Sequence, residues 1–236
     1  MRISRSRRNL CGQVAHDLGC RILAGELKPG TAIPQEWTLC DQLGVSRTVV
    51  REAIKSLAAK GLVESRAKRG TIVRPDRSWN YLDPEVLDWQ ARADIDGRHL
   101  FHLTELRQTI EPAAAGMAAE RATDESLRLI AEAYEQLQRT ADSVEDFLAA
   151  DIRFHVEILH ATGNPCFAPV ANVIAASLES SLRVTNRQPE DNRASVPVHR
   201  RVMKAICARK PSSARAAMRS LLSEAADRIT RASGSA

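Results

Sequence analysis

The sequence predicts a mainly α-helical protein of two domains: an N-terminal winged helix-turn-helix, which is α-helical with a small β-hairpin wing, and a C-terminal all-α helical bundle. The first observation is a pair of short helical patterns joined by a glycine turn and followed by a hairpin pattern, all within residues 40–73. The second is that apolar residues recur with helical spacing from residue 97 almost to the end, without any period-two alternation. At 236 residues the chain is long enough for two separate cores.

Charge is distributed unevenly between the two predicted domains. Residues 1–78 contain 15 Lys and Arg against 7 Asp and Glu, whereas residues 79–236 contain 19 against 22. The N-terminal part therefore suits a polyanionic partner. The sequence shows no export signal, no apolar run of membrane-spanning length and no CxxC pair among its five cysteines. We expect a cytoplasmic protein with reduced thiols and no membrane partner.

The chain begins with a basic segment followed by a supporting helix. Residues 1–8 hold four arginines and two serines, a composition that predicts a disordered basic arm. Apolar side chains then recur with helical spacing from Asn9 to Gly25, which predicts the first helix of a domain that covers residues 9–75.

Two helices meet at a tight turn after Cys40. The first ends at Gly44, and the Ser46 hydroxyl can cap a new helix that begins at Arg47. Apolar residues at helical spacing predict the buried face of this second helix: Val50, Ala53, Ile54 and Leu57. The outward face is then cationic at its leading end, where Arg47, Thr48 and Arg51 lie. An exposed Arg can donate two parallel hydrogen bonds to a guanine in the major groove of DNA.

A basic hairpin follows this second helix. Residues 62–65 and 71–73 have the composition of two short strands, joined by a turn of basic residues and glycine. Basic side chains at such a tip bind phosphates, and the tip glycine allows the backbone to approach them. The order of turn, cap, basic helix and basic hairpin predicts a protein that binds double-stranded DNA. The predicted DNA-binding residues are Ser46, Arg47, Thr48, Arg51, Arg66, Lys68, Arg69 and Gly70.

The same residues carry a family resemblance. The segment VSRTVVREAIKSLAAKGLVESRAKRGTIV, preceded by PGTAIPQEWTLCDQLG, resembles the GntR family of bacterial transcription regulators. The resemblance implies a homodimer that binds a short palindromic operator. One position departs from the family pattern, because Glu36 is followed by Trp37 where the family usually has an Arg.

Residues 76–97 are predicted to form a linker and a short docking helix. Asp83 is placed to cap this helix, and Pro84 is placed at its first turn. Residues 98–231 then read as a bundle of about six helices, with breaks predicted near residues 123–124, 142–143, 163–165, 188–189 and 210–211.

Asp151 and His155 are spaced by four residues on one predicted helix, and His199 lies on another. A carboxylate and two imidazoles that point into a bundle can bind a divalent metal. Taken alone, such a pair is more often a local hydrogen bond or a surface pair.

The helical half also resembles a known domain, the ligand-binding domain of the FadR-type branch of the GntR family, over about residues 98–230. The match includes LRQTIEPAAAGMAAERA and the Asp-x-x-x-His element. In metal-binding relatives one Asp and three His hold the ion, so the resemblance implies a metal site of Asp151, His155 and His199. Leu221 stands where the last His is expected. Three outcomes remain open: zinc or a similar divalent metal with open positions, an effector bound directly by these groups without metal, or a vestigial site.

Two further residues are predicted to bind an effector. Arg107 can pair with a carboxylate through its guanidinium, although an ion pair with Glu111 one turn later is an alternative. Ser195 lies one turn before His199 and can direct its hydroxyl into the same pocket. The predicted effector site therefore contains Arg107, Asp151, His155, Ser195 and His199.

The function that follows is a ligand-responsive transcription regulator. The segment WNYLDPEVLDW resembles the galactonate-operon repressors within the family, which implies a repressor of sugar-acid genes that leaves its operator when an aldonate binds. An activator, or a regulator that responds to another small carboxylate, fits the same residues. A hydrolytic enzyme is not favoured, because the sequence shows no nucleophile motif or general base beside Asp151, His155 and His199. A purely structural DNA-binding protein would leave the helical half without a role.

Overall fold

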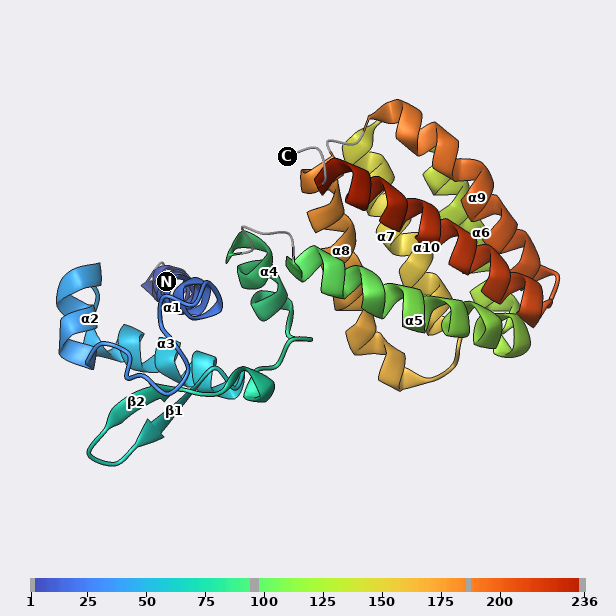
Figure 1. Ribbon diagram of the computed structural model, residues 1–236. Coiled ribbons are helices and arrows are strands. Elements are labelled where there is room, and N and C mark those ends of the chain that lie inside the picture. Colours follow the sequence, from blue (N-terminus) through green and yellow to red (C-terminus); the bar gives the residue numbers. More distant parts are fainter. Residues whose placement is uncertain (1–2, 94–97, 186–187, 234–236) are drawn as a thin grey trace. The chain divides into compact units, whose positions relative to one another are not determined.

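A computed structural model describes residues 3–93, 98–185 and 188–233. The chain forms two compact units, Met1–Asp96 and Gly97–Ala236, and each is described by itself. The first contains α1–α4 and the β-hairpin, and the second contains α5–α10 (Figure 1). Both units have the architecture that the sequence predicts, a winged helix-turn-helix and an all-α bundle, so the predicted fold class is confirmed.

The first unit is built on three helices. These are α1 (Ile3–Leu23), α2 (Glu36–Leu43) and α3 (Arg47–Ala59), and α3 packs against both of the others. Apolar residues from all three fill its core, among them Val14, Leu18, Ile22, Leu39, Val50 and Leu57.

Helix α1 begins earlier than predicted. The structure is helical from Ile3, so the expectation of a disordered arm over residues 1–8 is wrong for residues 3–8. The physical reason is that arginine is a good helix former and that neither proline nor glycine interrupts this segment.

The turn between α2 and α3 has the predicted chemistry. Gly44 ends α2 in the left-handed region with φ of 64°, which a residue with a Cβ adopts only with strain. Ser46 caps α3 through its hydroxyl oxygen, which accepts a hydrogen bond from the Val49 amide at 3.4 Å. All four residues that the sequence assigned to the inner face of α3 are buried.

The wing is an antiparallel pair of strands, β1 (Val63–Arg66) and β2 (Gly70–Val73), in which Arg66 pairs with Gly70. A bridge between Ala32 and Ile72 ties the segment before α2 to this hairpin. Gly70 has φ of 77°, and no atom lies within 4 Å of the place where a Cβ would stand. The glycine therefore serves the turn conformation here, since the space around it is open.

A short 3-10 helix, η1 (Asp76–Ser78), leads to α4 (Pro84–Ala93), which packs on α1 within the first unit. Asp83 caps α4 as predicted and also accepts hydrogen bonds from the Lys60 ammonium at 2.9 Å. Trp89 is buried against Gly19 of α1, where an added Cβ would lie 2.3 Å from the indole. The docking helix is therefore part of the core of the first unit.

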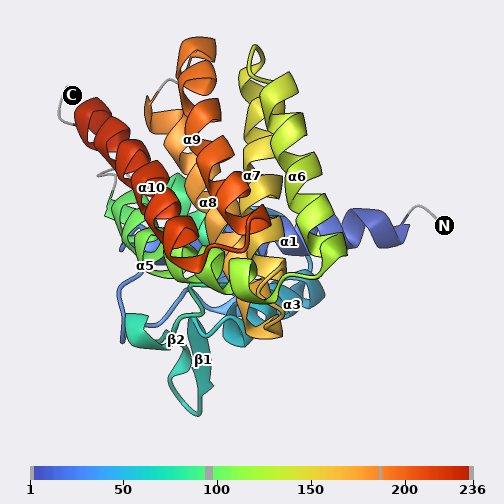
Figure 2. The ribbon, with the colours of Figure 1, turned by 90° about the vertical axis from the view of Figure 1, so that its right-hand side faces the viewer.

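The second unit is a bundle of six long helices within the described residues. Their bounds are α5 (Arg98–Arg121), α6 (Asp124–Arg139), α7 (Val144–His160), α8 (Ala168–Thr185), α9 (Pro189–Cys207) and α10 (Pro211–Ser233), and a 3-10 turn η2 (Pro165–Phe167) precedes α8. Each boundary falls at a break that the sequence predicts. Helices α6 and α7 pack side by side, and α10 packs against α5 and α9 (Figure 2).

Alanines make the contact between α5 and the rest of the bundle close. Ala114, Ala115, Ala118 and Ala119 are almost fully buried. Buried residues of the other helices that pack in this core include Ile130, Leu137, Phe147, Phe154, Ile158, Val202, Ile206 and Met218. None of the helices in the described part of the chain has the length and apolar character of a membrane span.

Candidate functional site

The outward face of α3 carries the residues predicted to contact DNA. Arg47 and Arg51 are exposed over 77% and 66% of their side chains. Both lie near Glu36 of α2, at 3.7 and 3.8 Å, so one carboxylate positions the two guanidiniums on the same face. Thr48 is exposed between them. The Ser46 hydroxyl is engaged as the helix cap through its oxygen, and its O–H can still donate.

The tip of the wing carries the other predicted contacts. Lys68 and Arg69 are exposed, and Lys68 has a positive φ of 62° in the turn. The Arg66 guanidinium forms an ion pair with Glu64 on the same strand, with Nε 2.7 Å from Oε1. Arg66 is therefore partly neutralised within the wing, whereas Lys68 and Arg69 project from its tip.

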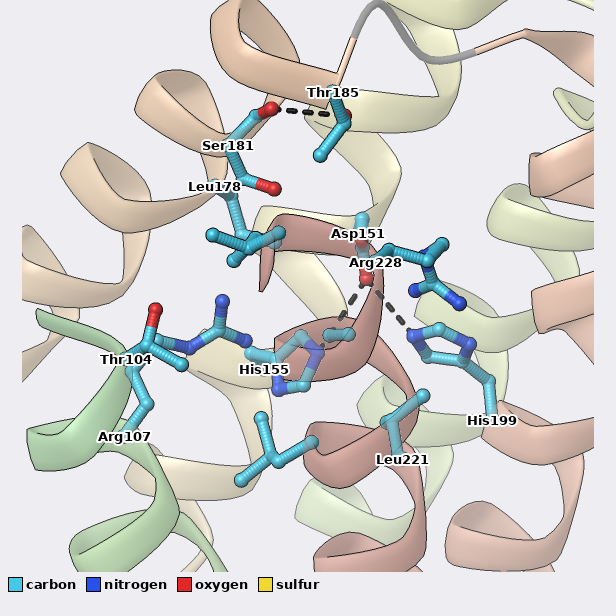
Figure 3. Close-up of a pocket in the computed structure, with 13 residues that line it drawn as sticks. Thr104, Arg107, Asp151, His155, Leu178, Ser181, Thr185, His199, Leu221 and Arg228 are labelled. Carbon is cyan, nitrogen blue, oxygen red and sulfur yellow. Dashed lines mark hydrogen bonds and ion pairs between the residues drawn. The ribbon is translucent and has the colours of Figure 1, made fainter. Parts of the chain in front are cut away.

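The second unit contains a cavity that gathers most of the predicted effector site (Figure 3). Four of the five predicted residues line it: Arg107 from α5, Asp151 and His155 from α7, and His199 from α9. The other lining residues are Thr104, Leu178, Ser181, Thr185, Leu221, Leu222, Ala225, Arg228 and Ile229. Its volume of about 30 Å³ is room for about two water molecules.

Two imidazoles converge on one carboxylate oxygen in this cavity. His199 Nε2 lies 2.9 Å and His155 Nε2 3.4 Å from Asp151 Oδ1, and all three residues are only 2% exposed (Figure 3). The opposite nitrogen of each ring is held separately. His199 Nδ1 lies 2.9 Å from the Ser195 carbonyl, which can only accept, so this nitrogen carries the hydrogen.

The Nδ1 atom of His155 donates to Glu111 of α5, whose other carboxylate oxygen accepts from Arg107 Nε at 2.6 Å. Arg107 therefore forms the ion pair with Glu111 and also lines the cavity, and its binding of an effector carboxylate stays a prediction.

These contacts shift the titration of the buried groups. Burial alone would raise the pKa of Glu111, but Arg107 and His155 lower it to about 2. Burial alone would lower the pKa of His155, but Glu111 and Asp151 raise it to about 9. The pKa of Asp151 lies well below its usual value because the two imidazoles outweigh the effect of burial.

One prediction about this site changes. The Ser195 side chain is not among the residues that line the cavity, because its hydroxyl donates to the Asn192 carbonyl within α9 at 2.9 Å. Ser195 instead meets the site through its main chain, which holds His199. Leu221 of α10 lines the cavity beside the three polar groups, at the position where the resemblance implies a further His.

The donor set of Asp151, His155 and His199 fits a divalent metal. One carboxylate oxygen and two imidazole nitrogens lie within 4.8 Å of one another, and all three residues are buried. The ring hydrogens on Nδ1 are held by a carboxylate and a carbonyl, an arrangement that commonly orients metal-binding imidazoles. Two nitrogens and one oxygen suit zinc and similar first-row ions.

Sequence reasoning missed several residues of the cavity. Thr104, Ser181, Thr185 and Arg228 come from α5, α8 and α10, and no local spacing relates them to Asp151. The sequence predicts Glu111 only as an intrahelical partner of Arg107. One feature of the sequence points to more than that: Glu111 lies one turn from Arg107 on an alanine-rich helix. Such a helix packs closely against its neighbours, which brings the carboxylate within reach of another helix.

Comparisons with known proteins agree with this organisation. Residues 10–73 match the family of bacterial regulatory proteins called gntR, and residues 102–224 match the FCD domain. The galactonate operon transcriptional repressor of Escherichia coli is 37% identical over 168 residues, which is 71% of this chain and 73% of that protein. The regulator Mce2R of Mycobacterium tuberculosis is 31% identical over 92% of this chain and 90% of its own length.

Solved structures show the same architecture. A GntR protein of Streptococcus agalactiae is 26% identical and covers 93% of this chain and 99% of its own, with a TM-score of 0.52. The Listeria monocytogenes regulator Lar, at 20% identity, covers 94% of this chain and 96% of its own with a TM-score of 0.67, which supports the fold alone. The chain therefore belongs to the GntR family of bacterial regulatory proteins and, with its FCD domain, is a ligand-responsive transcriptional regulator of the FadR type rather than an enzyme.

Proposed function

We propose that this regulator is a cytoplasmic homodimeric repressor of sugar-acid catabolic genes. It binds a palindromic operator through α3 and the wing of each subunit, and it leaves that operator when an aldonate such as galactonate enters the FCD cavity. The observation that carries the proposal is the joint presence of Arg107 and the Asp151, His155 and His199 cluster in one cavity. The similarity to the galactonate operon repressor supports the choice of acid.

The operator contacts are assigned by chemistry. Arg47 and Arg51 present guanidiniums on the exposed face of α3, where a major groove admits a helix and Arg can bind guanine O6 and N7. Lys68 and Arg69 at the wing tip supply phosphate contacts that depend on salt. The two-fold symmetry of a dimer then requires an operator of two related half-sites.

The effector contacts follow from the same cavity. Arg107 binds the carboxylate, and a divalent metal such as zinc, held by Asp151, His155 and His199, would act as a Lewis acid toward a carboxylate or hydroxyl oxygen. Thr104, Ser181 and Thr185 line the other walls and can pair with the hydroxyls of a polyol.

The small volume of the cavity means that effector binding requires a conformational change. About 30 Å³ holds an ion and a water but not a six-carbon acid, so the lining helices must move to admit one. An effector that binds only the opened arrangement shifts the conformational equilibrium by its difference in affinity for the two states. We propose that this opening changes the dimer geometry, so that the two DNA-binding units no longer match the half-sites.

The test begins with selection of duplexes from a random pool by the purified protein, which identifies the operator. Fluorescence anisotropy with that duplex should then show salt-dependent binding, release by D-galactonate, and no release by galactose, which lacks the carboxylate. Gluconate and lactate serve as alternative carboxylates. Release by lactate alone would assign another acid, and binding that never prefers a selected duplex over a random one would refute the proposed repressor.

A further inference from the structure

The buried carboxylate of Glu111 joins the two parts of the effector cavity. The residue lies on α5 and is 1% exposed. Its Oε1 accepts from Arg107 Nε at 2.6 Å, and its Oε2 accepts from Nδ1 of His155 on α7. One carboxylate therefore contacts both the guanidinium assigned to the effector and an imidazole assigned to the metal.

The contact with His155 fixes which ring nitrogen faces the cluster. Glu111 Oε2 accepts the hydrogen bond at this contact and Oε1 accepts from Arg107, so the hydrogen lies on Nδ1 of His155. Nε2, 3.4 Å from Asp151 Oδ1, is then the nitrogen that faces the cluster, and it offers its lone pair to a cation once its own proton is released. The Ser195 carbonyl likewise accepts from Nδ1 of His199 and directs its Nε2 toward the cluster. Of the two groups that hold the imidazoles, Glu111 is the charged one.

The contact with Arg107 fixes the guanidinium in the cavity wall. Because Nε is committed to Glu111, the terminal nitrogens are the donors that remain for a ligand carboxylate. The Arg107 side chain is 7% exposed, so its ion pair with Glu111 is screened little by water. This pair therefore fixes the orientation of the guanidinium more strongly than a surface ion pair does.

The charges of the buried groups make the two sites interdependent. Glu111 and Asp151 are balanced by Arg107 and by whatever positive charge the imidazoles hold. A divalent cation that displaces the proton from Nε2 of His155 places its charge beside the Nδ1–H donor to Glu111, so one carboxylate is shared between the cation's ligand and Arg107.

We infer that Glu111 is a positioning residue that couples cation binding at His155 to carboxylate binding at Arg107, so that each ligand raises the affinity for the other. The inference rests on the proposed function of the cavity. Coupling between two sites is reciprocal and commonly amounts to 5- to 150-fold in affinity. Loss of the group that holds a metal-binding imidazole commonly lowers metal affinity by about 10- to 100-fold.

The experiment titrates the full-length, EDTA-treated protein with ZnCl2 and with D-galactonate, each in the absence and presence of the other, by isothermal calorimetry. Glu111→Gln removes the charge with little change of shape, and Glu105→Gln, an exposed carboxylate on the same helix, is the matched control. We expect Glu111→Gln to weaken Zn²⁺ binding 10- to 100-fold and to reduce the coupling factor toward one. Glu105→Gln should keep both wild-type values.

A spectroscopic readout separates positioning from mere folding. The visible bands of the Co²⁺-loaded protein report the ligands of the ion, and they should shift in Glu111→Gln and return toward wild type in Glu111→Asp, while far-UV circular dichroism stays helical in all three. A Zn²⁺ affinity and a coupling factor in Glu111→Gln within threefold of wild type would overturn the inference. Failure of wild type to bind galactonate would instead refute the proposed effector; the Zn²⁺ and Co²⁺ measurements would still decide whether Glu111 positions His155, and the coupling titration would be repeated with gluconate and lactate.

Discussion

Leu221 offers a direct test of the metal site, because it lines the cavity beside Asp151, His155 and His199 and is 4% exposed. The substitution Leu221→His places a third imidazole on that wall. Without metal the variant should be less stable by about 2 kcal/mol, since a buried leucine contributes roughly 1.5–3 kcal/mol relative to an exposed one. This figure covers both the lost apolar contact and the burial of an imidazole without a partner, because the ring itself restores part of that contact.

Zn²⁺ should reverse the order of stability. If a fourth ligand tightens Zn²⁺ binding about 100-fold, the variant gains about 2.8 kcal/mol more than wild type at saturating metal. That gain exceeds the loss of about 2 kcal/mol in the metal-free state. The stability of Leu221→His should therefore fall below wild type in EDTA and rise to or above it in excess ZnCl2.

The assay is guanidinium unfolding followed by circular dichroism, with EDTA or with ZnCl2, for wild type, Leu221→His and Leu221→Gln. The glutamine variant loses the same apolar contact but supplies a poor metal ligand, so it should stay below wild type in both conditions. An equal Zn²⁺ response of Leu221→His and Leu221→Gln would show that position 221 does not reach the ion, and the reasoning about this cavity would be refuted.

Four further outcomes are expected. Arg51→Ala should weaken binding to the selected operator by about 1–3 kcal/mol and relax its sequence preference, measured by anisotropy with single-base variants. Arg107→Ala should retain operator binding but lose release by galactonate in the same assay. The metal-free protein should lose stability as pH rises from about 6.5 toward 9, because the raised pKa of His155 favours folding only while that ring is protonated. The loss in the free energy of unfolding should reach roughly 3 kcal/mol at most, and urea unfolding across this pH range measures it. Trp37, which is 60% exposed on α2, should show altered fluorescence on operator binding, and Trp37→Ala should weaken that binding several-fold.

Each of these outcomes has a control. Lys55→Ala, an exposed cation farther along α3, should lower affinity without changing base preference, and an unchanged preference in Arg51→Ala would remove that residue from base recognition. Release that survives in Arg107→Ala would mean that another group holds the carboxylate. His155→Gln should flatten the pH dependence of stability, and an unchanged slope would contradict the origin proposed for it. Trp37→Phe should retain affinity but lose the fluorescence change. A change that persists in this variant would come from the two remaining indoles, Trp79 and Trp89.

Local sequence alone determined most of the secondary structure. Gly44, Ser46 and Pro84 placed the starts and ends of helices where they occur, because capping and backbone freedom act over a few residues. The breaks in the second unit follow Pro and cap residues in the same way. The spacing of Asp151 and His155 was also a local fact, since side chains four residues apart share one face of a helix.

Only the tertiary structure decided how distant helices meet. The packing of α9 brings His199 into the cavity, and one helix by itself does not specify which of its faces turns inward. The Ser195 hydroxyl stays out of the cavity because it donates to the Asn192 carbonyl. The close packing of α5 brings Glu111 to His155 across 44 residues of sequence. The sequence thus determined the elements and the kinds of chemical groups they carry, whereas the packing between helices, which depends on non-local burial, decided which groups share the cavity and how much room it has.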